Sequence, residues 1–259
     1  MSMPSEREAV APRRAALITG GSRGIGAATT LALARRGYDT IITYRNKAAR
    51  AEEVVAAVAA LGGNALAIAA DMTEQAAIDA LFGRVGAWCA RLDLLVLNAS
   101  GGLERDLVAA DPDYPLRLNR DAQLATVAAA RPLLAPGGTI AFITSHWAHR
   151  YGQVRQLPAY EAVAMSKHAG EVALRERQDE LAAQGLRLLV ITGDLVEGTI
   201  TPKLLARAAD RLHQATDVPD RLPTTDEMGE AIAAAANDTR LPSGHTVVIG
   251  RGLDELPLD

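Results

Sequence analysis

The sequence of 259 residues contains one cysteine and no hydrophobic run near the ~20 residues that span a bilayer. Cys89 cannot form an internal disulfide and has no His or Cys beside it. We therefore expect a small buried side chain, a reducing cytoplasm and no metal site. The polar stretch from Met1 to Arg14 lacks the apolar segment of a secretory signal. The net charge of −4 provides no basic surface, so neither nucleic acid nor an anionic membrane is an expected partner.

The sequence does contain a regular alternation of short apolar runs and helix-like stretches, which is typical of βαβ units. It predicts strands at residues 15–19, 40–44, 65–69, 93–97, 138–143, 186–191 and 246–249. It predicts helices at residues 26–36, 48–61, 74–90, 116–134 and 162–184. The expected fold class is α/β, with one doubly wound parallel sheet of seven strands.

The domain organisation follows from this alternation. Residues 1–14 are expected to form a flexible tail, and residues 15–259 a single domain without internal repeats. The segment 199–226 interrupts the rhythm with three prolines and leaves from the carboxyl end of the sixth strand. Ligands of open α/β sheets bind at that edge. The segment is therefore predicted to be a lid over the substrate, with a surface insertion as the alternative.

The loop from Thr19 to Gly26, with the sequence TGGSRGIG, lies between the first strand and the first helix. Its glycines allow a tight turn and a close approach of the backbone to a pyrophosphate, while free N–H groups at the helix start face the anion. This context predicts a Rossmann-type dinucleotide site. The expected cofactor contacts in the loop are Gly20, Ser22, Arg23, Gly24, Ile25 and Gly26.

The end of the second strand reads Tyr-Arg-Asn-Lys and carries no carboxylate. A site specific for NAD would place an acid there against the ribose 2′-hydroxyl. Arg45, together with Arg23, could instead bind a 2′-phosphate through charge-assisted hydrogen bonds. The sequence therefore predicts NADPH/NADP+ as the cofactor, although ordinary surface arginines are the alternative.

Taken together, these motifs resemble the short-chain dehydrogenase/reductase superfamily from about Ala15 to Gly252. The resemblance implies catalytic roles for Asn119, Ser145 and Lys167. It also implies cofactor contacts for Asp71 and Met72 after the third strand, and for the Asn-Ala-Ser-Gly turn after the fourth. In that turn the implied contacts are Asn98, Ser100 and Gly101. The remaining implied cofactor contacts are Lys167, Gly193 and Thr199. The family also suggests a homo-oligomer, a tetramer or dimer, built on the helices that carry Asn119 and Lys167.

One departure from the family pattern is chemically important. The family places its catalytic tyrosine four residues before the lysine, on the same helix face, and here that position is Val163. Tyr160 is seven residues before Lys167, and seven residues rise ~10.5 Å along a helix. With Pro158 favouring a helix start nearby, we predict that Tyr160 faces the entry of the pocket. It would then be a substrate contact, and a proton-donating Tyr160 is the alternative.

The loop after Ser145 offers further side chains to a substrate. His146, His149 and Tyr151 could donate a proton, although packing or solvent contacts are the alternative for each. Trp147 is predicted to provide an aromatic wall or to fill the core. The expected substrate contacts are therefore Ser145, His146, Trp147 and Tyr160.

Reduction of a ketone needs hydride delivery and neutralisation of the developing alkoxide. Without the usual tyrosine, a hydroxyl on the substrate itself could stabilise that oxyanion. Aromatic polyketides of the angucyclinone type carry such hydroxyls, so we predict an NADPH-dependent ketoreductase of antibiotic biosynthesis with an aromatic ketone as substrate. The alternatives are a non-catalytic NADPH-binding sensor or regulatory protein, and an ordinary reductase of small ketones that uses Tyr160.

Overall fold

In the computed structural model, which describes residues 13–199, 201, 221–256 and 258, seven parallel strands form one sheet in the order β3-β2-β1-β4-β5-β6-β7. This order confirms the predicted α/β class and its doubly wound topology, with the reversal between β1 and β4. The strands are β1 (Arg14–Ile18), β2 (Tyr38–Tyr44), β3 (Ala65–Ala69), β4 (Leu92–Leu97), β5 (Leu134–Ser145), β6 (Arg187–Gly193) and β7 (Thr246–Ile249).

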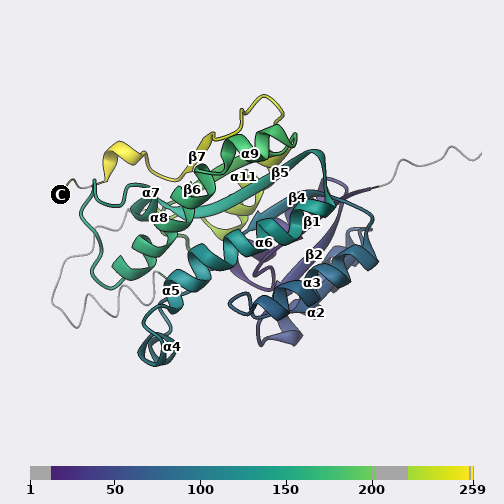
Figure 1. The fold of residues 1–259 in the computed structure, drawn as a ribbon, viewed down its shortest axis with the longest axis horizontal. Helices are drawn as coiled ribbons and strands as arrows, with labels where there is room; N and C mark the ends of the chain where they lie inside the picture. The colour runs from purple at the N-terminus through teal and green to yellow at the C-terminus, as the bar shows by residue number, and fades with distance from the viewer. Residues whose placement is uncertain (1–12, 200, 202–220, 257, 259) are drawn as a thin grey trace, which may run out of the picture.

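Helices cover both faces of this sheet (Figure 1). One face packs against α1 (Gly24–Arg35), α2 (Ala48–Ala60) and α11 (Thr225–Asn237). The other face packs against α3 (Gln75–Trp88), α6 (Ala122–Ala130), α8 (Glu161–Arg175) and α9 (Gln178–Ala183). The short helices are α4 (Arg105–Ala110), α5 (Tyr114–Leu116), η1 (Arg117–Asp121), η2 (Arg131–Leu133), α7 (His146–His149) and η3 (Leu253–Glu255).

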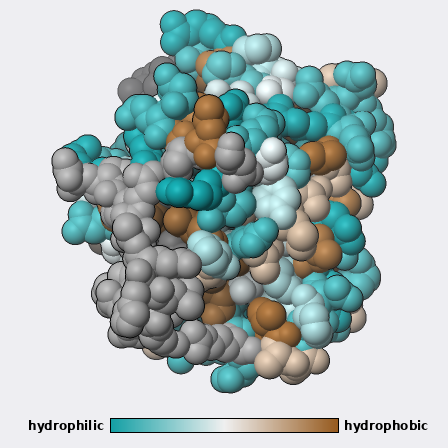
Figure 2. Space-filling model, turned by 90° about the vertical axis from the view of Figure 1, so that its left-hand side faces the viewer, coloured by the Kyte–Doolittle hydropathy of each residue, from teal (hydrophilic) through white to brown (hydrophobic). Residues whose placement is uncertain are grey.

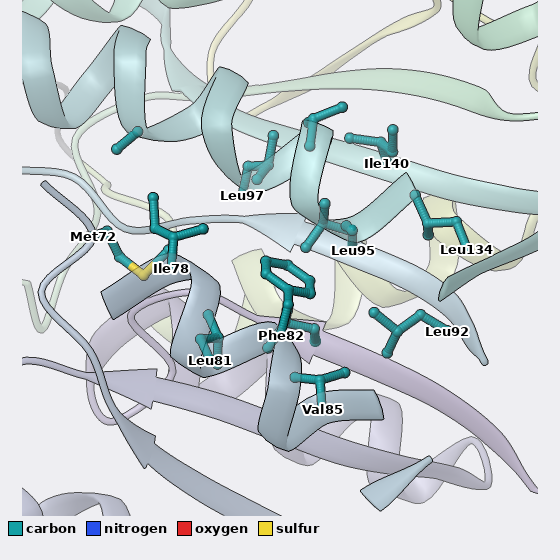
Figure 3. Packing of buried hydrophobic residues seen from close by; sticks show 14 of the residues in the cluster. Met72, Ile78, Leu81, Phe82, Val85, Leu92, Leu95, Leu97, Leu134 and Ile140 are labelled. Carbon is teal, nitrogen blue, oxygen red and sulfur yellow. The ribbon is translucent and has the colours of Figure 1, made fainter. Parts of the chain in front are cut away.

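The middle parts of the central strands are mostly apolar, because both of their faces are buried. Figure 3 shows the layer between α3 and the sheet, where Phe82 of α3 lies against side chains of β4. Ile78, Leu81 and Val85 of α3 belong to the same cluster, with Leu92, Leu95 and Leu97 of β4 and Ile140 of β5. Each of these side chains leaves at most a tenth of its surface exposed. This packing fixes the sheet, whose carboxyl edge carries the site.

Several predicted boundaries need correction. Arg14 belongs to β1, so the expected tail of residues 1–14 is too long by one residue. The predicted helix at 116–134 passes through a π-helical turn, η1, before α6 begins. The predicted helix at 162–184 is interrupted after Arg175, and β5 is much longer than the six residues expected. Most of the predicted lid at 199–226 lies outside the described residues.

No helix among the described residues is long and apolar enough to cross a membrane. The same part of the chain contains no cluster of His, Cys, Asp and Glu side chains that could hold a metal ion. On the face that Figure 2 shows, hydrophobic residues lie as separate patches among hydrophilic ones.

Candidate active site at the carboxyl edge of the sheet

The glycine loop leaves β1 and enters α1 with a backbone that other residues could not follow. Gly20 and Gly24 have φ angles of +67° and +54°, in the left-handed region. A Cβ atom on Gly26 would lie 2.4 Å from the carbonyl oxygen of Gly20. The loop is therefore a cradle of bare backbone at the N-terminus of a helix, and such a cradle suits a pyrophosphate.

Asn98, at the end of β4, holds this loop in place. Its Nδ2 donates to the carbonyl oxygens of Thr19 and Gly20, at 2.9 and 3.2 Å. The hydroxyl oxygen of Thr19 in turn accepts hydrogen bonds from the backbone N–H groups of Asn98 and Ala99. The side-chain amide of Asn98, a predicted cofactor contact, therefore also fixes the conformation of the glycine loop.

A cavity of about 590 Å³ extends from the glycine loop across the ends of β2 and β3. Most of the predicted cofactor contacts line it, namely Gly20, Ser22, Arg23, Gly24, Ile25, Gly26, Arg45, Asp71, Met72, Asn98, Ser100 and Thr199. One carboxylate oxygen of Asp71 accepts hydrogen bonds from the N–H and hydroxyl of Thr73, which fixes the carboxylate at the cavity wall. These residues remain predicted cofactor contacts, and the structure brings them to one cavity.

A second cavity of about 480 Å³ adjoins the first and shares Arg23, Arg45 and Thr199 with it. Its walls bring together the ends of β5 and β6, the start of α8 and the turn after β4. The predicted residues that line it include Gly101, Ser145, Trp147, Tyr160, Lys167 and Gly193. Its position beside the cofactor-sized cavity makes it the candidate substrate pocket.

Tyr160 does not face the pocket entry, and that expectation is wrong. Its side chain is 6% exposed, and its hydroxyl donates to Ser145 Oγ over 3.1 Å. The estimate from helical rise failed because Tyr160 is the residue that caps α8, with the helix beginning at Glu161. A cap residue lies outside the regular side-chain rows of the helix, so spacing along the helix does not fix the direction of its ring.

The environment of Tyr160 keeps its phenol protonated. Burial raises the pKa of Tyr160, and the hydrogen bond with Ser145 opposes part of that rise. Ser145 Oγ also accepts a hydrogen bond from the backbone N–H of Ala148, at 3.3 Å. Because this oxygen accepts from two donors, its own proton can be directed toward a bound carbonyl oxygen.

Lys167 is buried on the α8 face that carries Val163. Burial lowers the pKa of Lys167 to about 8, because a low-dielectric environment disfavours the ammonium ion. No described side chain forms a hydrogen bond or ion pair with its amino group. Val163, 4% exposed, lines the smaller cavity together with Lys167. The amino group of Lys167 is thus available to a ligand bound in the smaller cavity, which Lys167 lines.

Asn119, predicted to be catalytic, lines neither cavity. Its Nδ2 donates to the carbonyl oxygen of Gly101 and to Ser166 Oγ, both at 2.9 Å. Its Oδ1 accepts a hydrogen bond from the N–H of Gly101 at 3.3 Å. In this structure, the side chain joins the turn after β4 to α8.

The side chains after Ser145 divide into two groups. Trp147 lines the substrate pocket as predicted, with the guanidinium carbon of Arg251 5.3 Å from the centroid of its ring. His146 lines neither cavity, so the structure does not support the predicted substrate contact. Its side chain is fully buried, its Nδ1 lies 2.9 Å from Thr192 Oγ1, and burial lowers its pKa to about 4.

His149 and Tyr151 also lie outside both cavities. His149 Nδ1 lies 2.8 Å from the carboxylate of Glu171, and the ring of Tyr151 packs against that of His168. Neither side chain is placed to donate a proton in the pocket.

Several residues that line the cavities are not among those predicted from the sequence. Asp194 follows Gly193 in the substrate pocket and forms a 2.8 Å ion pair with Arg251. Glu104 and Tyr114, in the segment after β4, reach the cavity at the end of β2. Asp194 directly follows the carboxyl end of β6, where ligands of such sheets bind, so its position in the sequence could have indicated a place in the pocket. Nothing local in the sequence indicated that Tyr114 would meet a residue 69 positions away.

The sequence profile described as short chain dehydrogenase matches residues 14–208 of this chain. The chain therefore belongs to the short-chain dehydrogenase/reductase family and is an NAD(P)-dependent oxidoreductase. It is 30% identical to the 1-cyclohexenylcarbonyl-CoA reductase of Streptomyces collinus over 262 aligned residues, which cover 98% of this chain and 91% of that relative.

Two solved structures extend the comparison. One is a short-chain dehydrogenase from Burkholderia cenocepacia in complex with NADP, with a TM-score of 0.77 and 29% identity over 93% of this chain and 98% of that chain. The other is the promiscuous reductase LugOII, described as catalysing keto-reduction at C1 during lugdunomycin biosynthesis. It superposes with a TM-score of 0.77 and 25% identity over 93% of this chain and 98% of that chain.

Proposed function

We propose that this protein uses NADPH to reduce the ketone of a flat aromatic substrate of polyketide type, with Tyr160 as the proton donor. The observation that carries the proposal is the 3.1 Å hydrogen bond between Tyr160 and Ser145 in the wall of the smaller cavity. Two hydroxyl groups converge there at the place where a carbonyl oxygen would be held. The similarity to a polyketide ketoreductase supports the same substrate class.

The larger cavity fits the dinucleotide. The glycine backbone that lines it has no room for a side chain at Gly26, and Arg23 and Arg45 add positive charge to its lining. Two guanidinium groups suit the 2′-phosphate of NADPH, whereas a carboxylate at this point would favour the ribose hydroxyls of NADH. When bound, the cofactor supplies a hydride to the carbonyl carbon.

The protein's own side chains handle the charge that this transfer creates. As the carbon–oxygen π bond breaks, its electron pair moves to the oxygen, which then takes the phenolic proton of Tyr160. Ser145 donates a second hydrogen bond to the same oxygen and lowers the barrier by stabilising the alkoxide. The tyrosinate that remains is reprotonated from solvent. Lys167 would bind the nicotinamide ribose. Its side chain is buried and lines the smaller cavity, and its amino group has no partner among the described residues.

The lining of the smaller cavity favours an extended apolar ligand. Its side walls are formed by Trp147, Leu103, Leu195, Val163 and Met228. A planar ring system can stack on or beside Trp147, while Val163 removes the polar group that a standard tyrosine would have placed there. An aromatic ketone meets both conditions.

A second candidate reaction is the conjugate reduction of an α,β-unsaturated thioester. It is favoured by one observation, the near full-length similarity to a reductase whose named substrate carries a ring alkene beside a thioester carbonyl. In that reaction the hydride goes to the β-carbon, two bonds farther from the carbonyl oxygen. A phenol displaced along α8, as Tyr160 is relative to Val163, could hold the oxygen at this greater distance.

The test compares the wild-type protein with Tyr160→Phe and with the matched control Tyr151→Phe, whose ring lies outside both cavities. NADPH consumption is measured with a bicyclic aromatic ketone, with the same ketone carrying a neighbouring hydroxyl, and with a cyclohexenyl thioester. We expect Tyr160→Phe to lower kcat by about 10²–10⁴-fold on the preferred substrate, and Tyr151→Phe to leave it unchanged.

The products decide between the candidates. An alcohol from the ketone supports ketone reduction, and a saturated thioester supports conjugate reduction. If Tyr160→Phe retains turnover within about tenfold and only the hydroxylated ketone reacts, the substrate itself provides the proton and Tyr160 is not the donor.

A further inference from the structure

Arg45 is the arginine best placed to meet a 2′-phosphate, but it is exposed at the end of β2 and its side chain is long. A free arginine loses side-chain entropy when it binds, which weakens the contact it makes. Two hydrogen bonds reduce that loss here. Arg45 Nε donates to Asn46 Oδ1 at 3.1 Å, and Nη1 donates to the hydroxyl oxygen of Tyr114 at 2.7 Å.

Tyr114 is a rigid anchor for this contact. It begins α5, has Pro115 next to it, is 5% exposed and belongs to the hydrophobic cluster under the sheet. Tyr114 and Arg45 both line the larger cavity, and the Tyr114 hydroxyl meets the Arg45 guanidinium there. The segment after β4 thus places the hydroxyl oxygen of Tyr114 in a fixed position beside Arg45 at the end of β2.

The chemistry of the anchor also matters. A carboxylate in place of the phenol would neutralise the guanidinium and repel a phosphate. Burial and the nearby carboxylate of Glu104 raise the pKa of Tyr114, which keeps the phenol neutral. Arg45 forms no ion pair with a carboxylate of the described residues, and its Nη2 group has no hydrogen-bond partner among them. A guanidinium has five N–H donors, so it can bind a phosphate without releasing Tyr114.

We propose that Tyr114 is a specificity-determining residue for the cofactor: it positions Arg45 for the 2′-phosphate of NADPH, from the opposite side of the cleft. The inference rests on the NADPH preference in the proposed function and is independent of which carbonyl substrate is reduced. Tyr114 acts through Arg45, so it is a positioning residue for cofactor binding.

The experiment measures NADP+ and NAD+ affinities by titration calorimetry in the absence of any carbonyl substrate. The proteins are wild type, Tyr114→Phe, Arg45→Met, the double variant and the control Tyr38→Phe. The control also removes a phenol that makes one side-chain hydrogen bond, to Asn237, away from both cavities. We expect Tyr114→Phe to weaken NADP+ binding by about three- to tenfold and to leave NAD+ binding unchanged.

The double variant tests the mechanism. If Tyr114 works through Arg45, its substitution has no further effect on NADP+ affinity once Arg45 is methionine. Adenosine 2′,5′-bisphosphate and AMP, used as ligands that lack the nicotinamide, should show the same contrast. Melting temperatures of all variants establish that each remains folded.

Other outcomes overturn the inference. An equal loss for NADP+ and NAD+ would make Tyr114 a general support of the cavity, and no loss would remove its role entirely. An effect that persists beside Arg45→Met would place its action elsewhere. Equal affinity of the wild type for both dinucleotides would refute the NADPH preference itself, which is distinguishable from a failure of Tyr114 alone.

Discussion

Burial sets the protonation states of the side chains around the smaller cavity. Burial raises the pKa of Tyr160, so its phenol stays protonated. It lowers the pKa of His146 to about 4, so the imidazole is uncharged at neutral pH, and it lowers the pKa of Lys167 to about 8. The three shifts have the same physical origin, since each favours the uncharged form of the group. At neutral pH the smaller cavity is therefore lined by a protonated phenol, Tyr160, and an ammonium group, Lys167. The ammonium group loses its charge as the pH rises above about 8.

Cofactor affinity is predicted to depend on pH through Lys167. Its pKa of about 8 means that the ammonium form, which binds ribose hydroxyls more strongly, is lost as the pH rises through 8. Titration of the wild type with NADP+ between pH 6.5 and about 9.5 should show weaker binding above pH 8. Lys167→Met should bind more weakly at low pH and show a flat profile in that range. A wild-type profile without a step near 8 would contradict the prediction.

At the scale of secondary-structure elements, α8 is held against η1 by an unusually close approach. A Cβ atom on Gly170 would lie 2.1 Å from the carbonyl oxygen of Asn119, so only glycine fits between the two helices. This contact and the hydrogen bond from Asn119 to Ser166 fix α8 relative to the turn after β4. The approach therefore sets where Lys167 and Tyr160 stand relative to Ser145.

Gly170→Ala is predicted to destabilise the protein by about 1–3 kcal/mol, because the added methyl group pushes two packed backbones apart. The matched control is Gly83→Ala in α3, where a Cβ atom would meet no atom within 4 Å. That exposed substitution should stabilise the protein by about 0.5–1 kcal/mol through helix propensity. Urea unfolding measures both. A neutral result for Gly170→Ala would show that the helices separate at little cost.

At the scale of the whole molecule, the site exists because parallel strands end at one edge. The ends of β1, β4, β5 and β6 contribute the glycine loop, the turn after Asn98, Ser145 and the segment after Gly193. This convergence is a property of βαβ topology, so the sequence predicted the fold class and the strand segments, and most of the expected cofactor contacts line the two cavities. Each of those signals lies within a few residues along the chain.

The parts that the sequence did not predict depend on contacts between distant segments. Tyr160 meets Ser145 because the loop between α7 and α8 directs it inward, and no periodicity describes that loop. Asn119 turned out to bind Gly101 and Ser166, a pairing that a motif comparison cannot supply. His146 directly follows Ser145 in the chain, but its ring does not line the pocket, because it forms a hydrogen bond with Thr192 of the neighbouring strand.

The C-terminal part of the chain is linked to the pocket by a buried ion pair. The side chains of Arg251 and Asp194 are 11% and 1% exposed, and Arg251 also lies over Trp147. Arg251→Ala should lower the free energy of unfolding by about 3–5 kcal/mol, because it leaves the Asp194 carboxylate buried without its guanidinium. It should also raise KM more than it lowers kcat, since the pocket wall moves and the proton donor does not.

The control for this prediction is Arg240→Ala. Its ion pair with Asp238 has an arginine that is 88% exposed, so solvent replaces the contact and the unfolding free energy should not change measurably. Equal stability of the two variants in urea unfolding would show that the Arg251 pair contributes no more than a surface contact.

Tyr160 lies at the cap of α8, so the two side chains of the proposed reaction centre, Tyr160 and Lys167, belong to the start and the interior of this helix. The lysine is fixed by the helix, whereas the phenol is supplied by the loop that precedes it. If Tyr160 is the proton donor, as proposed, a change in the length or composition of that loop would move the donor along the substrate while Lys167 stayed in place. Fingerprints that require a fixed interval between tyrosine and lysine would classify such a protein as inactive, and enzyme engineers could use the same freedom to choose which atom of a substrate is protonated.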